Sequence, residues 1–217
     1  MVYAALSRMG LINDIGTIVL TSSSEYSIGS LVTLVSHIHY YRSQNNGDPI
    51  VKVACAPHLV DRIKEYLLTG GLDGTMVGVS SDIDGVSIHF FETSIAESSF
   101  VLNTGSTQPL NIIHSGSING PMFDSLQDND LMYSLRADPS NVIVFHEASV
   151  FDDDNSCNYE KLSEWSGTFK NFFTFGHNKI DGSTMTFNER YMRSLSTSDG
   201  QNEFNIEKTV SLPTTNR

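Results

Sequence analysis

The sequence predicts an α/β fold, and three short apolar runs are the main reason. Residues 17–21, 51–56 and 75–80 have the continuous apolar character of strands that are covered on both faces. Helical patterns separate them, and strand–helix–strand units of this kind build parallel sheets. The expected architecture is a Rossmann-like parallel sheet with flanking helices, followed by a polar, irregular C-terminal extension.

Each helix between these runs has its own signals. The first, expected over 28–42, has apolar residues at helical spacing and stops at the polar sequence QNNGDP. The second can begin with Pro57 in its first turn, and it ends at Gly70-Gly71. Its predicted apolar face consists of Leu59, Ile63, Tyr66 and Leu67.

The second half of the chain is less regular. An edge strand is expected at 86–93, a strand or a helix end at 98–103, and a buried strand at 142–145. Helices are expected over 123–138 and 159–175, and the sequence from Gly176 onward is polar. We therefore expect one domain over 1–175 and an extension over 176–217, which would pack on the domain or on neighbouring chains.

The charge pattern disfavours some partners. There are 25 acidic and 13 basic residues, for a net charge of −12, and the basic residues form no stripe. Direct nucleic-acid or anionic-membrane binding needs such a stripe and is therefore not expected. No stretch approaches the length of a membrane span, no leader pattern is apparent, and the two cysteines match no metal spacing. We expect a soluble cytoplasmic or intracellular protein.

The first half of the chain resembles the N-terminal Rossmann-like domain of GT-B glycosyltransferases. The matching residues are Val51, Val53, Ala54, Ala56 and Pro57, then Leu59 to Leu68, then Gly71-Leu72 and the strand MVGVS. The segment SNVIVFHEAS resembles a later strand of that domain, so the similarity covers residues 16–80 and 138–150. The resemblance implies a nucleotide sugar as the donor substrate.

The loop after the first strand is where such a protein would bind or activate its acceptor. Inverting members of the family have a histidine there as the general base, whereas this loop has Ser22, Ser23, Ser24 and Glu25. Glu25 is the candidate base if burial raises its pKa, and the alternative is a solvated carboxylate. The serines are candidate binding residues.

A second candidate site follows the run NIIH. The segment IIHSGSINGPMFDSL is similar to the family's diphosphate-binding element, in which a glycine loop precedes a helix. His114, Gly116, Asn119 and Gly120 match that element in residue type, but not in spacing or in position along the chain. The alternative interpretation is an ordinary turn rich in glycine and serine.

An acidic run and an aromatic cluster complete the candidates. Asp152 and Asp154 resemble the acidic metal clamp of GT-A glycosyltransferases, which holds Mn²⁺ or Mg²⁺, and His146 and Glu147 precede them. An acidic surface loop is the alternative. The aromatic cluster forms either a core or a partner-binding face; it consists of Trp165, Phe169, Phe172, Phe173 and Phe175.

Two functional hypotheses follow from this pattern. The first is a non-catalytic structural or interaction protein with no cofactor, which works in a homo-oligomer or larger assembly such as a viral particle. The second is a small glycosyltransferase-like enzyme or a nucleotide-sugar-binding module. No donor motif is complete and the first loop lacks a histidine, so we favour the first hypothesis.

Overall fold

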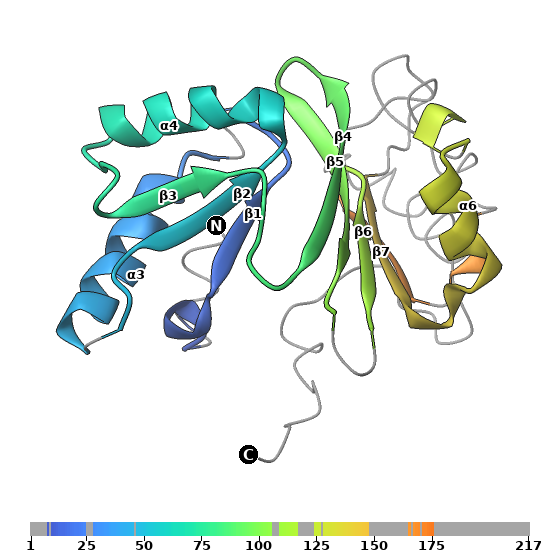
Figure 1. Cartoon of the computed structure of the whole chain (residues 1–217), viewed down its shortest axis with the longest axis horizontal. Coiled ribbons are helices and arrows are strands. Elements are labelled where there is room, and N and C mark those ends of the chain that lie inside the picture. Colours follow the sequence, from blue (N-terminus) through green and yellow to red (C-terminus); the bar gives the residue numbers. More distant parts are fainter. Residues whose placement is uncertain are drawn as a thin grey trace, which may run out of the picture. The chain divides into compact units, whose positions relative to one another are not determined.

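The structure is a computed structural model that describes residues 8, 10–24, 28–45, 47–105, 109–116, 124–126, 128–147, 165, 167–169 and 171–175. The chain has mixed α/β structure (Figure 1). It divides into two compact units, Met1–Gly105 and Ser106–Arg217. The predicted extension over 176–217 lies outside the described residues.

The first unit contains a three-stranded parallel sheet. Its strands are β1 (Thr17–Leu20), β2 (Val51–Cys55) and β3 (Val77–Ser80), in the order β1-β2-β3. All three predicted strands are confirmed. Their apolar residues alternate onto one shared face, since Ile18 pairs with Val53 and Val53 pairs with Val79.

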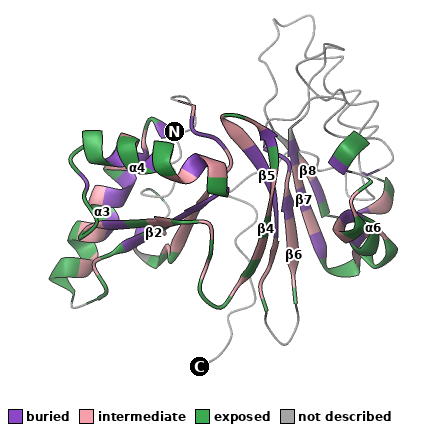
Figure 2. Cartoon of the chain, turned by 45° about the horizontal axis from the view of Figure 1, so that its top comes forward, coloured by how far each residue is buried: buried purple, intermediate pink, exposed green. Residues whose placement is uncertain are grey.

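Two helices cover that face. A short turn, η1 (Ile12–Asp14), precedes β1, and α3 (Leu31–Gln44) connects β1 to β2. The turn η2 (Pro57–Leu59) and helix α4 (Val60–Thr69) connect β2 to β3. Because the strand order does not reverse, right-handed crossovers place both helices on the same side of the sheet. Both carry buried and exposed residues in Figure 2, and their buried residues join the sheet in one core.

The end of α4 fits closely against α3. Gly70 is the C-cap of α4, and a Cβ atom added there would lie 2.5 Å from Cγ2 of Val32 on α3. Gly71 has a φ of +84°, which a residue with a side chain rarely adopts. The predicted stop at Gly70-Gly71 therefore has two separate causes, a lack of space at the first glycine and a left-handed backbone at the second.

The first unit also contains an antiparallel hairpin. Strands β4 (Ser87–Ser94) and β5 (Glu97–Asn103) pair antiparallel, with Phe90 opposite Phe100. The register shifts between Glu92 and Ser94, just before the turn. The strand predicted at 86–93 is confirmed, and the open choice at 98–103 is resolved as a strand.

The second unit contains three parallel strands. They are β6 (Asn111–His114), β7 (Val142–Glu147) and β8 (Asn171–Phe175), with β7 paired to both of the others. Between β6 and β7 lie α6 (Asp130–Ala137) and the turn η3 (Pro139–Asn141). Asn129 caps α6, its side-chain oxygen accepting a 3.0 Å hydrogen bond from the Leu131 N–H.

Two expectations need correction in this unit. The α/β class is confirmed, but β7 pairs with β6 and β8 and does not extend one Rossmann-like sheet with β1–β3. The helix predicted over 159–175 is wrong at 171–175, which form β8. An apolar run does not specify its pairing partner, and a phenylalanine-rich segment suits a strand as well as a helix.

The aromatic cluster belongs to the core where the structure describes it. Trp165, Phe169 and Phe172 are buried, while Phe173 is half-buried. The Trp165 ring meets the Phe169 ring at 5.7 Å between centroids in an edge-to-face arrangement. The core interpretation of these residues is thus confirmed. No helix in the described part of the chain is long and apolar enough to cross a bilayer.

Candidate functional site

The carboxyl end of β1 is closed by the hairpin of the same unit. The Ser23 N–H donates a 2.9 Å hydrogen bond to the carbonyl oxygen of Ala96 in the β4–β5 turn. The Ser98 N–H donates a 2.7 Å hydrogen bond to the carbonyl oxygen of Thr21. Ser22 and Glu97 lie opposite each other as an isolated antiparallel bridge. The start of β5 therefore pairs with the segment that follows β1.

The predicted binding serines take part in this closure. Ser22 and Ser23 are buried, with 6% and 4% of their surface exposed, and Ser24 is half-buried. The Ser22 hydroxyl donates to Ser24 Oγ at 3.0 Å and accepts from the Ser24 N–H at 3.0 Å. The Ser23 hydroxyl donates to the Ala96 carbonyl at 3.4 Å. The polar groups of these serines are thus hydrogen-bonded to one another and to the Ala96 carbonyl oxygen in the β4–β5 turn. The candidate base Glu25 lies outside the described residues.

A compact turn follows β6 at the second candidate site. The Gly116 N–H donates a 3.0 Å hydrogen bond to His114 Nδ1, and Gly116 has a φ of +62°. The Ser115 N–H donates to the carbonyl oxygen of Phe145 at 3.0 Å, and its hydroxyl donates to the carbonyl oxygen of Gly116 at 2.8 Å. His114 and Gly116 therefore lie together as predicted, while Asn119 and Gly120 lie outside the described residues.

The environment of His114 favours the neutral imidazole. Its ring lies 6.3 Å from the Phe145 ring, and burial lowers its pKa from 6.5 to about 4. A neutral ring whose Nδ1 accepts the Gly116 N–H does not supply a positive charge to a diphosphate. The arrangement is that of a turn held by its own side chains.

The candidate metal residues fall into two groups. His146 is buried in the second unit, its ring 5.5 Å from Trp165 and 6.3 Å from Phe172. Asp152 and Asp154 lie outside the described residues. Among the residues that the structure describes, no group of three or more His, Cys, Asp or Glu side chains is placed to hold a metal ion.

Cys55 is a second group whose pKa is shifted by burial. It ends β2 with no exposed surface, and burial raises the pKa of its thiol from 9.0 to about 11. The thiol is therefore protonated and weakly nucleophilic at neutral pH. The prediction that Cys55 acts as a small core residue is confirmed.

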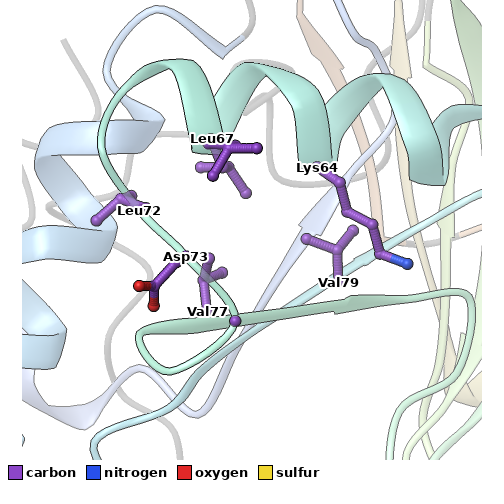
Figure 3. Close-up of a pocket in the computed structure, with 8 residues that line it drawn as sticks. Lys64, Leu67, Leu72, Asp73, Val77 and Val79 are labelled. Atoms are coloured by element: carbon purple, nitrogen blue, oxygen red, sulfur yellow. The ribbon is translucent and has the colours of Figure 1, made fainter.

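A cavity between α4 and β3 has no counterpart in the sequence-based candidates. It has a volume of about 230 Å³, and Figure 3 shows Leu67 of α4 facing Val77 of β3 across it. Leu67 is buried, but its neighbour Leu68 is 64% exposed and also lines the cavity. The feature of the sequence that could have indicated this site is Leu68, a large apolar residue outside the predicted apolar face of the helix.

Comparison with solved structures shows a similarity of fold. Neither a scan of protein-family models nor a search of curated protein sequences finds a match. Among solved structures, the chain is similar to the metallo-beta-lactamase fold protein YhfI from Bacillus subtilis. The TM-score is 0.57 at 10% sequence identity, over 84% of this chain and 73% of that protein.

The expected relationship to the GT-B N-terminal domain is therefore wrong. The structural similarity is to a metallo-beta-lactamase fold, and the strand resembling the later GT-B strand pairs with β6 and β8. The physical reason is that the alternation of strand and helix patterns in a sequence depends only on which residues are buried. Unrelated α/β folds share that pattern, so it does not distinguish one family from another.

Proposed function

We propose that this chain is a non-catalytic interaction protein that works within a larger assembly. The observation that carries the proposal is the closure of the β1 end by the β4–β5 turn. Open α/β sheets usually bind ligands at the carboxyl ends of their strands. Here the Ser23 N–H and the Ser22 and Ser23 hydroxyls are engaged within the chain, and both side chains are buried.

Exposed features elsewhere in the first unit support an interaction role. Leu68 on α4 is 64% exposed beside the cavity. Among the strands in the described residues, β3 is terminal in its sheet, and terminal strands offer backbone groups to other chains. The proposal includes self-association and the sequence-based hypothesis of a surface subunit in a viral particle as one form of assembly.

Size-exclusion chromatography with light scattering, over a wide range of protein concentrations, tests the proposal. We expect a mass above that of the monomer that rises with concentration. Calorimetric titration with a UDP-sugar is the second arm, and no heat of binding is expected. A monomer at every concentration that also binds the UDP-sugar would contradict an interaction role.

A further inference from the structure

We propose that the outer edge of β3, together with the α4–β3 cavity, binds a second copy of this chain in a two-fold antiparallel arrangement. This inference rests on the proposed interaction function and names its partner. The two β3 strands would pair around an axis at Gly78, with Val79 of each copy opposite Val77 of the other. Two three-stranded sheets would then form one continuous sheet.

The backbone at this edge is suited to pairing. The carbonyl oxygen of Met76 accepts a 2.9 Å hydrogen bond from the Val51 N–H, so the backbone carbonyl of Met76 points toward β2. Backbone groups alternate along a strand, and those of Val77 and Val79 therefore point to the outer edge. The Val77 N–H is bonded to the Asp73 carbonyl at 3.0 Å. The Val79 N–H of each copy can donate to the Val77 carbonyl of the other.

The cavity supplies the apolar part of the interface. Leu67, Leu72 and Val77 are buried and line it, and Val79, which also lines it, is half-buried. Leu68 is mostly exposed at the same cavity. A strand added at the edge of β3 would cover this surface, and in a two-fold dimer the Leu68 side chains of both copies would be brought to it.

The charges at the cavity are self-complementary under the same symmetry. Figure 3 shows Lys64 at the Val79 end and Asp73 toward the opposite end, near Val77. Hydrogen bonds from the Thr75 hydroxyl (2.6 Å) and N–H (2.8 Å) lower the pKa of Asp73, which is therefore ionised at neutral pH. Antiparallel pairing brings Lys64 of one copy to the end that carries Asp73 of the other.

This complementarity favours a second copy over an unrelated peptide. A foreign strand would need its own matching acidic and basic groups, whereas two-fold symmetry supplies both without any further requirement. The net charge of −12 opposes association, but exposed charges more than about 8 Å apart are largely screened at physiological salt. The edge has four residues, so we expect a weak, concentration-dependent dimer.

Disulfide trapping tests the proposed register directly. Gly78 is exposed, and a Cβ added there would meet only Cγ2 of Ile50, at 3.7 Å. Opposed residues in an antiparallel pair have Cα atoms about 4.5–5.5 Å apart, within the range that a disulfide spans. In a Cys157→Ser background, Gly78→Cys should give a cross-linked dimer on mild oxidation. Lys52→Cys, on the same face of the inner strand β2, is the matched control and should not.

Charge variants provide an independent measurement by sedimentation. Lys64→Glu should raise the dimer Kd by about tenfold, because it places a carboxylate opposite Asp73 of the second copy. Arg62→Glu changes the net charge equally from an exposed position on α4 that does not line the cavity, so it should have little effect. Leu68→Ser should also weaken the dimer, and Ile95→Ser, at an 87% exposed site on the hairpin turn, should not.

The outcomes separate this inference from the proposed function. A wild-type chain that self-associates, with no Gly78→Cys cross-link and equal effects of Lys64→Glu and Arg62→Glu, would overturn the β3 dimer alone. A wild-type chain that is monomeric at every concentration would also overturn the dimer. In that case the interaction function would fail as well only if the monomer bound the UDP-sugar.

Discussion

The Ser98 N–H donates a 2.7 Å hydrogen bond to the carbonyl oxygen of Thr21, although 77 positions separate the two residues in the sequence. This bond and its companion between Ser23 and Ala96 join the end of β1 to the start of β5. The loop that a sequence pattern would assign to ligand binding is thereby part of the fold. Four predictions test how this unit and its neighbour are stabilised.

Ser22→Ala should lower the free energy of unfolding by about 1 kcal/mol. The substitution removes the hydroxyl that accepts from the Ser24 N–H and donates to Ser24 Oγ, in a site that is 6% exposed. Urea denaturation followed by circular dichroism measures the change. Ser87→Ala, at an exposed position on β4, is the control, and equal losses in the two variants would refute the role of the Ser22 bonds.

Gly70→Ala should destabilise the chain by about 1–3 kcal/mol, because the new methyl group overlaps with Val32. Val32→Ala removes the atom nearest to the added Cβ, so the double variant should recover part of the loss. Gly16→Ala is the control, since a Cβ there meets nothing within 4 Å. Thermal or urea unfolding of the four proteins measures both effects. Additive losses in the double variant would contradict the proposed clash.

Stability should fall as the pH drops from 6.5 toward 4. Burial holds the pKa of His114 near 4 in the folded chain, while the unfolded chain takes up its proton near 6.5. Between these values the unfolded state binds more protons, so the free energy of unfolding rises with pH and His114 adds no slope above 6.5. The contribution across this window is at most about 3 kcal/mol.

The variant His114→Asn isolates this contribution. An asparagine oxygen can accept the Gly116 N–H in place of Nδ1, but the side chain does not titrate in this range. Urea unfolding at several pH values should show a smaller slope for His114→Asn than for the wild type. Thr33→Asn, at an exposed position on α3, changes no titratable group and should keep the wild-type slope. An unchanged slope in His114→Asn would exclude His114 as its source.

Cys55 should resist alkylation while the chain is folded. Its thiol is fully buried and its pKa is raised to about 11, so little thiolate is present at mildly alkaline pH and the reagent has no access. Mass spectrometry of the Cys55 peptide after iodoacetamide treatment should show no modification in buffer and full modification in denaturant. Rapid labelling in buffer would contradict the burial of β2.

Particular elements show how far the sequence could predict the fold. The runs 17–21, 51–56 and 75–80 became β1, β2 and β3 because short apolar runs favour strands that pack against a core. The structure covers one face of this sheet with helices, and Lys52 and Gly78 on the other face are exposed. Pro57 and Gly70-Gly71 mark the start and end of the second helical segment, because the backbone angles that proline and glycine favour do not depend on distant contacts. Local patterns failed at 171–175, because pairing with β7 makes this segment a strand.

The candidate site was less predictable. The residue types at Ser22, Ser23 and His114 are compatible with ligand binding. In the structure, however, these segments contact Ala96, Ser98 and Phe145, which lie far away in the sequence. The same holds for the cavity under α4, where only the exposed Leu68 gave a signal.

The sequence by itself determined the α/β class and the core positions of the first unit, because periodic burial is a local property of the chain. Only the tertiary structure decided which strands pair and that the loop after β1 is closed. Strand pairing and hydrogen bonds between distant segments depend on long-range contacts, which residue patterns along the chain do not encode.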